Sequence, residues 1–208
     1  MYDATTPLGE FIEAAAARKP TPGGGSVTAL VGALAAALGE MVLNYSIGKK
    51  ELSEYETELK PALTEMTHAR KLLLQLMIED QLAYEEVARL RKMKPEESER
   101  IEKQPAALLA AIGAPQAMAA TAVAVLELCD RIVNFVNIHL LSDLAVCADL
   151  AMATARCAIY NVRVNLSEEL SASDRREIES SISRVLGNAA VLIQQVSRRI
   201  WARHGQNL

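Results

Sequence analysis

Apolar residues spaced alternately four and three positions apart constrain the fold of this chain more than any other feature. The series runs through Leu59, Leu63, Met66, Arg70, Leu73, Met77, Asp80, Tyr84 and Val87. Steps of four and three place side chains along one face of an α-helix, as in the seam of a coiled coil. The spacing therefore predicts one long helix over about 51–93 that packs lengthwise against other helices.

The other apolar segments also predict helices. Ala and Leu dominate an apolar content of 50%, whereas aromatic residues make up only 4%, and this composition favours helix over strand. The further expected helices cover about 6–19, 26–46, 106–112, 115–135, 142–160 and a last segment opened by Asp174 and Glu177. Residues 160–166 alternate as in a strand, but we favour a continued helix because no partner strand is found.

Local signals set the expected helix ends. Pro7 is expected at the first position of the first helix, and Ser26 and Ser142 are expected N-caps. Gly113-Ala114-Pro115 is expected to separate two helices, and Lys94–Gln104 is expected to form a charged loop with a short helix that starts at Pro95. Inside the second helix, small residues at Gly32, Ala36 and Gly39 predict that a neighbouring backbone packs closely.

Two apolar runs are long enough to raise the question of a membrane. Ser26–Leu43 has Glu40 as its one charge, and Pro105–Leu126 has none. Both are rich in Ala rather than in large apolar residues, so we expect them to be buried on all sides by protein and not to span a membrane. The expected fold is an all-α bundle of long antiparallel helices, one domain over 1–208. We expect it to form a homodimer through the apolar helices 26–46 and 115–135.

Charge and cysteine content argue against several classes of protein. The net charge of −4 disfavours a nucleic-acid partner, because phosphate binding needs a concentrated basic surface. Cys129, Cys147 and Cys157 are odd in number and match no zinc motif, so we expect buried, reduced thiols in a cytoplasmic protein. The three histidines do not cluster, so no metal site is expected. The N-terminal residues lack the pattern of a signal peptide.

Asp80 is the candidate catalytic residue, because a carboxylate in an apolar seam must be paired, protonated or functional. The structural alternative is that Asp80 holds a neighbouring helix by a hydrogen bond or pairs with Arg70. The loop Pro22-Gly23-Gly24-Gly25-Ser26 is a second signal, since free backbone N–H groups at a helix start can bind an anion or a polar ligand. A plain turn between helices is the alternative there.

A third group of polar residues lies between two apolar helices, at Asn137, Ser142 and Asp143. Helix capping alone explains Ser142 and Asp143, but it explains Asn137 less well. Asn161 and Asn165 also interrupt an apolar face. Asn137, Ser142 and Asp143 are therefore further candidates for a polar site.

Five stretches of the chain match, in order, the cyclodeaminase/cyclohydrolase family of folate enzymes. They are Pro20–Ser26, Met41–Lys50, Asp80–Tyr84, Asn137–Val146 and Tyr160–Asn165. The chain thus resembles a family that includes the C-terminal domain of formiminotransferase-cyclodeaminase and the stand-alone bacterial methenyltetrahydrofolate cyclohydrolases. The resemblance spans nearly the whole chain. It departs from the family pattern at Val136, where known members have Gly, and at Gln81-Leu82.

The resemblance implies an all-α homodimer with a folate groove at the Gly-rich loop, a functional carboxylate at Asp80, and no metal or redox cofactor. The activity it implies first is hydrolysis of 5,10-methenyltetrahydrofolate to 10-formyltetrahydrofolate. The alternatives are formimidoyltetrahydrofolate cyclodeaminase and a helical dimer that binds folate without turnover. Lys49 and Lys50 suit the glutamate tail of folate. The other expected substrate contacts are Pro22, Gly23, Gly24, Gly25, Ser26, Asn137, Ser142 and Asp143.

Overall fold

The computed structural model describes residues 1–166 and 170–205. Within them the α-helices are α1 (Leu8–Ala16), α2 (Gly24–Asn44), α3 (Glu56–Arg91), α4 (Ser98–Ile132), α5 (Leu141–Asn165) and α6 (Ala172–Gly205). Short 3-10 helices, η1 (Lys50–Tyr55) and η2 (Ile138–Leu140), precede α3 and α5. No strand occurs in the described residues, which confirms the all-α prediction and the continued helix up to Asn165.

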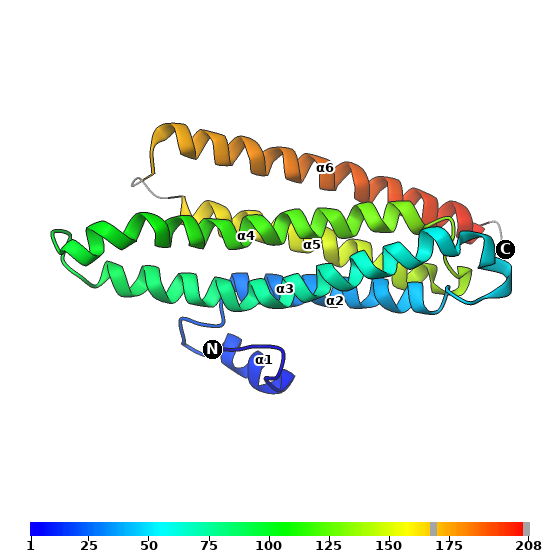
Figure 1. The fold of residues 1–208 in the computed structure, drawn as a ribbon, viewed down its shortest axis with the longest axis horizontal. Coiled ribbons are helices and arrows are strands. Elements are labelled where there is room, and N and C mark those ends of the chain that lie inside the picture. The colour runs from blue at the N-terminus through cyan, green and yellow to red at the C-terminus, as the bar shows by residue number, and fades with distance from the viewer. Residues whose placement is uncertain (167–169, 206–208) are drawn as a thin grey trace.

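Four long helices form an antiparallel bundle, on which two further helices lie (Figure 1). Both α2 and α4 pack against α3 and α5, so the four helices form a closed ring. The last helix, α6, lies along α4 and α5 on one side, and α1 lies below the bundle in this view. Successive long helices run in opposite directions, which confirms the predicted bundle.

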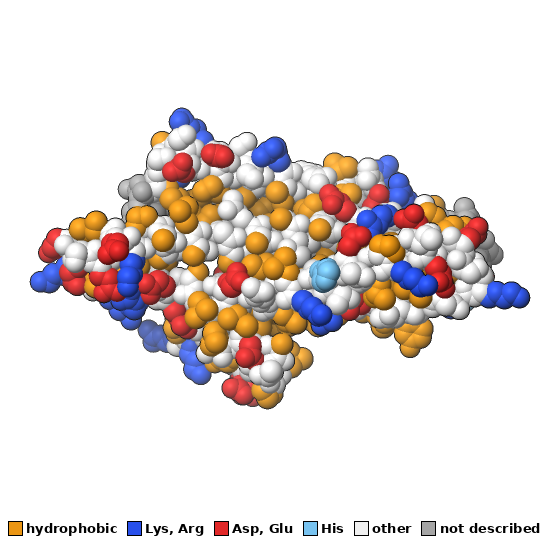
Figure 2. Space-filling view, in the orientation of Figure 1, with side chains coloured by type: hydrophobic (Ala, Val, Ile, Leu, Met, Phe, Trp, Pro, Cys, Tyr) orange, Lys and Arg blue, Asp and Glu red, His pale blue; other side chains and the backbone are white. Residues whose placement is uncertain are grey.

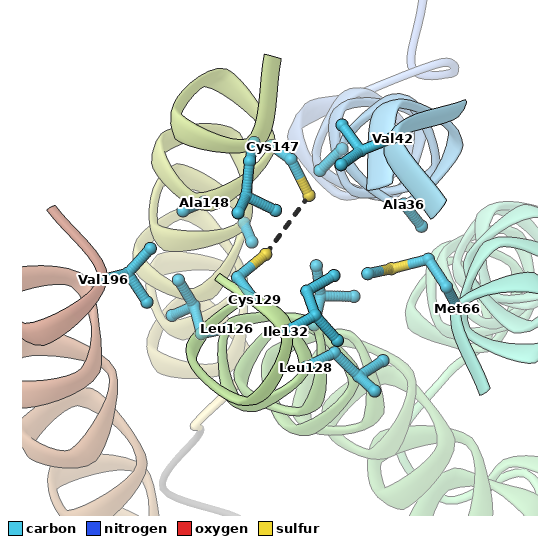
Figure 3. Close-up of a cluster of buried hydrophobic side chains, with 14 of the residues drawn as sticks. Ala36, Val42, Met66, Leu126, Leu128, Cys129, Ile132, Cys147, Ala148 and Val196 are labelled. Carbon is cyan, nitrogen blue, oxygen red and sulfur yellow. Dashed lines mark hydrogen bonds between the residues drawn. The ribbon is translucent and has the colours of Figure 1, made fainter. Parts of the chain in front are cut away.

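The core fills the centre of this ring (Figure 3). Cys129 of α4 and Cys147 of α5 are fully buried in it, with their Sγ atoms 3.5 Å apart. Met66 of α3 reaches α2 at Gly39, where an added Cβ would lie 2.5 Å from the Met66 Cε. At Gly32 an added Cβ would lie 2.9 Å from a side chain of α5. The predicted small-residue side of α2 is thereby confirmed, because it lets α3 and α5 pack closely.

The fourth helix is continuous, so the predicted break at Gly113-Ala114-Pro115 is wrong. Pro115 lies inside α4, and Ile112 and Met118 on either side of it are fully buried. A proline inside a helix costs about 3 kcal/mol. Burying two large apolar side chains contributes roughly 1.5–3 kcal/mol each, which offsets that cost. The helix begins at Ser98, within the expected charged loop 94–104.

Predicted helix ends differ from the structure by a few residues. Ser26 lies inside the first turn of α2, whose N-cap is Gly23, and Ser142 lies inside the first turn of α5. The last helix begins before Asp174, because the Ser171 Oγ accepts a 3.0 Å hydrogen bond from the Asp174 N–H. The predicted pair of Asp174 and Glu177 is therefore one turn too late. The expected ranges 6–19 and 51–93 shorten to α1 and α3, and the expected range 26–46 shifts by two residues to α2.

Three helical segments, α2, α4 and residues 138–165, are long and apolar enough to cross a membrane by length and composition alone. Protein covers 56%, 56% and 44% of their most apolar windows. The sequence predicts that the apolar helices are buried on all sides by protein, and a single chain buries them only in part. Cys157 of α5 is exposed, not buried as predicted, because it lies on an uncovered side of its helix. On the face shown in Figure 2, charged side chains of both signs gather over the α3–α4 turn.

Candidate functional site

Asp80 and Gly25 form the centre of the candidate site, where the C-terminal half of α3 passes the first turn of α2. The Ser26 hydroxyl donates a 3.5 Å hydrogen bond to the Asp80 Oδ2. A Cβ added to Gly25 would lie 2.1 Å from the Asp80 Oδ1 and 2.3 Å from Oδ2. The carboxylate therefore lies directly against the start of α2, where free N–H groups and the helix dipole favour negative charge.

Burial and hydrogen bonding shift the pKa of Asp80 in opposite directions. Desolvation raises the pKa above its ordinary value of 3.8, while hydrogen bonds from the Ser26 hydroxyl and backbone N–H lower it. The effect of burial is larger, so the pKa of Asp80 is raised. The alternative pairing with Arg70 does not form, because the Arg70 guanidinium binds Glu40 of α2.

A groove with a volume of about 460 Å³ opens beside the Asp80 carboxylate. The Gly-rich loop, the C-terminal half of α3 and the C-terminal end of α5 form its walls. Asp80, Tyr84 and Arg91 line the groove from α3. They are separated by four and seven positions, and therefore share one helix face. Asp80 is thus the acidic end of a row of groove-lining side chains on one face of α3.

The wall opposite α3 presents an amide oxygen from Asn161 of α5. The Asn161 Nδ2 donates to a backbone carbonyl one turn earlier at 2.9 Å and to the Thr28 Oγ1 at 3.3 Å. The Oδ1 faces Gly24, where an added Cβ would lie 3.1 Å from it. Asn165 secures this wall, because its Nδ2 donates a 2.7 Å hydrogen bond to the Ala111 carbonyl of α4.

The structure brings half of the predicted substrate-binding residues to Asp80. Gly23, Gly24 and Gly25 line the groove, and Ser26 is the hydrogen-bond donor to the carboxylate. Pro22 is buried in the same loop. Groove residues that the site prediction missed are Tyr84, Arg91 and Asn161. The sequence signal for Tyr84 and Arg91 is their spacing, because they follow Asp80 by four and eleven positions and so lie on the same helix face.

The other predicted binding residues lie at the opposite end of the bundle. These residues are Lys49, Lys50, Asn137, Ser142 and Asp143. The 21 residues of α2 separate the two groups and rise about 30 Å, at roughly 1.5 Å per residue. Lys49 pairs there with Glu51 at 3.6 Å, and the Asn137 N–H donates to the Ser46 Oγ at 2.9 Å. A single chain therefore does not bring these residues to the groove.

The described residues give the groove a carboxylate, amide and hydroxyl groups and one guanidinium. A carboxylate with a raised pKa accepts a proton more readily near neutral pH, and its charge stabilises a nearby cation. The described residues contain no group of three His, Cys, Asp or Glu side chains that could hold a metal ion. Asp80 is the carboxylate among the described groove residues, and it is therefore placed to act as a base on a bound molecule.

Comparison with known proteins gives consistent matches over most of the chain. The chain is 32% identical over 181 residues to a methenyltetrahydrofolate cyclohydrolase of Methylorubrum extorquens, covering 83% of this chain and 87% of that protein. It is 30% identical to formimidoyltransferase-cyclodeaminase of Gallus gallus over 89% of this chain, but spans only 35% of that longer protein.

Comparison of the structure with solved structures finds the same kind of enzyme as the sequence comparison. The crystal structure of formiminotetrahydrofolate cyclodeaminase from Thermotoga maritima superposes with a TM-score of 0.85 and 30% identity, covering 95% of this chain and 97% of the other. The formiminotransferase-cyclodeaminase family model matches residues 7–184, which include the Gly-rich loop, Asp80 and Asn161. This chain therefore belongs to the formiminotransferase-cyclodeaminase family of folate enzymes.

Proposed function

We propose that this protein hydrolyses 5,10-methenyltetrahydrofolate to 10-formyltetrahydrofolate. The observation that carries this proposal is the Asp80 carboxylate, held against Gly25 beside a groove of about 460 Å³. A relative that aligns with most of the chain is named methenyltetrahydrofolate cyclohydrolase. The substrate carries a positive charge at the carbon that bridges N5 and N10, and a desolvated carboxylate is the side chain that best stabilises such a charge.

In the proposed reaction a water molecule adds to the bridging carbon. Asp80 accepts a proton from the water as the new C–O bond forms, and its negative charge stabilises the cation before addition. The Asp80 carboxyl then returns the proton to N5 as the C–N5 bond breaks, and the new hydroxyl group loses its proton to solvent as the C=O bond forms, which leaves the formyl group on N10. Ser26 holds the carboxylate in place, and Asn161 offers its amide oxygen to the substrate from the opposite wall.

A second candidate is the cyclodeaminase reaction, which the names of other relatives and of the Thermotoga maritima structure favour. There N10 attacks a formimino carbon on N5, and ammonia leaves. Both reactions pass through a tetrahedral carbon bonded to N5 and N10, so the same carboxylate serves either. A helical protein that binds folate without turnover is the third candidate, but it gives Asp80 no reason to occupy a desolvated position.

We also propose that the protein is a homodimer. Side chains on α2 and α5 that remain partly or fully exposed repeat at alternating steps of four and three. They are Val27, Val31, Leu34, Leu38 and Met41 on α2 with Tyr45 directly after it, and Val146, Leu150, Ala153, Cys157, Tyr160 and Val164 on α5. Two packed helices with apolar stripes of this spacing form half of a four-helix interface. A second copy of the same face is the natural partner.

The proposed interface differs in one respect from the expectation based on sequence. The segment 115–135 was expected to contribute, but none of its large apolar side chains is exposed, because α3, α5 and α6 cover that part of α4. The second interface helix is α5. If two copies of α2 pack in antiparallel fashion, Lys49 and Lys50 of one copy approach the Gly-rich loop of the other. In such a dimer, Lys49 and Lys50 of one copy would contact the substrate bound to the other copy.

The remaining features of the proposal follow from composition and chemistry. Hydrolysis by a carboxylate needs no metal or redox cofactor, and the folate is the substrate. A net charge of −4 disfavours nucleic acid as a partner. A second copy over the exposed stripes would cover the apolar surface of α2 and α5 without a membrane. We therefore expect a cytoplasmic enzyme with one domain.

An absorbance assay of the methenyl chromophore tests the proposed function. The purified protein is expected to accelerate loss of the chromophore from 5,10-methenyltetrahydrofolate and to release no ammonia from 5-formimidoyltetrahydrofolate. Ammonia release from 5-formimidoyltetrahydrofolate, with appearance of the chromophore, would assign the cyclodeaminase reaction instead. If neither substrate is turned over but folate still binds, the protein is a folate-binding protein without catalytic activity.

A further inference from the structure

Among the described residues that line the groove, Arg91 is the one with a cationic side chain and Asp80 the one with an acidic side chain. Arg91 is exposed and makes no hydrogen bond or ion pair with any of the residues described in the structure. Arg89, two positions earlier, contrasts with it, because its guanidinium binds Glu86 at 2.8 Å and Glu99 at 3.0 Å. The groove therefore contains a cation that the described part of the chain leaves available to a ligand.

The spacing of the α3 side chains fits the length of a folate. Asp80 and Arg91 are eleven residues apart, which corresponds to a rise of about 16 Å along the helix. Long side chains on a helix lean toward the helix N-terminus, so an Arg91 side chain in this conformation would shorten that separation by several ångströms. From the bridging carbon of methenyltetrahydrofolate to the carboxylates of its first glutamate is roughly 10–13 Å, by standard bond lengths.

The order of chemical groups along the groove also fits. A folate bound with its cationic carbon at Asp80 places the aminobenzoyl ring next and the glutamate last. Tyr84, one turn after Asp80, lines the groove between the two charged ends, and an aromatic ring there can pack on the aminobenzoyl ring. The groove thus runs from anion through aromatic to cation, which complements the charges of the substrate.

We propose, on the basis of the proposed function, that Arg91 binds the carboxylate of the glutamate tail and so determines affinity for folates that carry it. A guanidinium pairs well with carboxylates because its N–H groups form two parallel hydrogen bonds. This role belongs to the same chain as Asp80 and requires no second copy. It therefore differs from the contribution expected of Lys49 and Lys50, which lie at the opposite end of the bundle.

Helix-end electrostatics is the competing explanation for Arg91, which lies in the last turn of α3, where cations stabilise the helix. The two explanations predict different results for ligands that differ only in the tail. A tail receptor discriminates between a folate and its glutamate-free pteroate analogue. A residue that serves only the helix end does not discriminate between them, and its removal lowers the melting temperature instead.

The test measures the Kd of 5-formyltetrahydrofolate and of glutamate-free 5-formyltetrahydropteroate by calorimetry, for wild type, Arg91→Met and Arg91→Lys. Arg91→Met is expected to raise the Kd of the glutamate-bearing ligand about tenfold, the loss of one charge-assisted hydrogen-bonded contact, and to leave the other Kd unchanged. Arg91→Lys is expected to restore part of the affinity. Lys92→Met is the matched control, because Lys92 is adjacent, exposed and outside the groove lining, and should change neither Kd.

Equal changes in both Kd values, no change in either, or no binding of either ligand by the wild type would overturn the role of Arg91. Turnover by the wild type is measured separately on the same preparation. If the wild type fails to turn over methenyltetrahydrofolate and formimidoyltetrahydrofolate but binds the glutamate-bearing ligand through Arg91, the proposed function is wrong and the tail contact stands. The two failures are therefore distinguishable.

Discussion

Replacing Gly25 by Ala tests whether the contact between α2 and Asp80 positions the carboxylate for its reaction. An alanine Cβ at this position would lie 2.1 Å from the Asp80 Oδ1 and 2.3 Å from its Cγ. Ordinary van der Waals contact begins near 3.4 Å, so the whole carboxyl group must retreat by more than about 1 Å. Rotation of the short side chain away from α2 would also break its hydrogen bond to Ser26.

The expected effect on activity is larger than the effect on stability. A displacement of about 1 Å at a reacting group costs roughly a hundredfold in rate, so kcat for the Gly25→Ala variant is expected to fall by about that factor. For stability, alanine gains about 1 kcal/mol over glycine as a helix residue, whereas overpacking costs about 1–3 kcal/mol. The net loss of unfolding free energy is therefore expected to be about 2 kcal/mol or less.

A matched control and a double-mutant cycle separate the two effects. Gly113 of α4 is also a helical glycine, but an added Cβ there meets no atom within 4 Å. Gly113→Ala is therefore expected to stabilise the protein by roughly 0.5–1 kcal/mol with normal kcat. In the Asp80→Asn background, Gly25→Ala should cause little further loss of kcat, because both substitutions act on the same carboxylate.

Two results would refute this reasoning about Gly25. The first is a folded Gly25→Ala enzyme with kcat near that of the wild type, which would mean that the position of the carboxylate does not matter. The second is full additivity of Gly25→Ala and Asp80→Asn, which would mean that Gly25 acts independently of Asp80. Steady-state kinetics at the methenyl chromophore, with thermal unfolding of each variant, provide both measurements.

Three further predictions concern pH, the distant lysines and the interface. Because burial raises the pKa of Asp80, the ionised carboxylate destabilises the folded protein above that pKa, and this destabilisation vanishes below the ordinary value of 3.8. The Asp80→Asn variant should therefore have a higher Tm than the wild type at pH 7, by a margin that shrinks toward acid pH. The kcat/KM of the wild type should fall as the carboxylate is protonated. An equal or lower Tm at pH 7 would contradict the assignment. Replacing Lys49 and Lys50 together by Met should raise KM, more so for polyglutamates, and leave kcat largely unchanged; loss of kcat at constant KM would reverse their role. Leu34→Glu should convert the dimer to a monomer in light scattering, because it places a charge on the apolar stripe of α2; a wild-type monomer at micromolar concentration would exclude the dimer.

The long helices of the fold could be predicted because their signals are repeated over many residues. The seam from Leu59 to Val87 continues through α3 without interruption, and Asp80 stands out because it breaks the apolar character of that seam. Gly32 and Gly39 likewise predict close packing that the structure confirms. Each of these predictions rests on the regular spacing of residues along a helix, which can be recognised without knowing the tertiary contacts.

Helix ends and the continuity of α4 could not be predicted from the same signals. Gly113 and Pro115 are local helix breakers, but the burial of Ile112 and Met118 depends on packing with distant segments. Ser26 is a favourable N-cap residue by type, yet its hydroxyl bonds to Asp80, 54 positions away. Local preference was overridden in both places by a tertiary contact.

The candidate site was predicted only in part because residues far apart along the chain form it. The Gly-rich loop and Asp80 were identified, and they meet in the structure. The sequence identifies Asn161 only as a polar interruption, since its position opposite Gly24 follows from the antiparallel packing of α2 and α5. Conversely, the sequence prediction assigns Asn137 to the same substrate site as the loop, although a 21-residue helix separates them.

The most direct test of the central claim is the turnover of 5,10-methenyltetrahydrofolate by Asp80→Asn beside the wild type. This variant keeps the shape of the side chain and removes its charge. It is expected to fold and to bind 5-formyltetrahydrofolate, while its kcat falls by roughly a hundredfold or more, as for the loss of a general base. A folded Asp80→Asn enzyme with kcat near that of the wild type would contradict the assignment of Asp80 as the catalytic base.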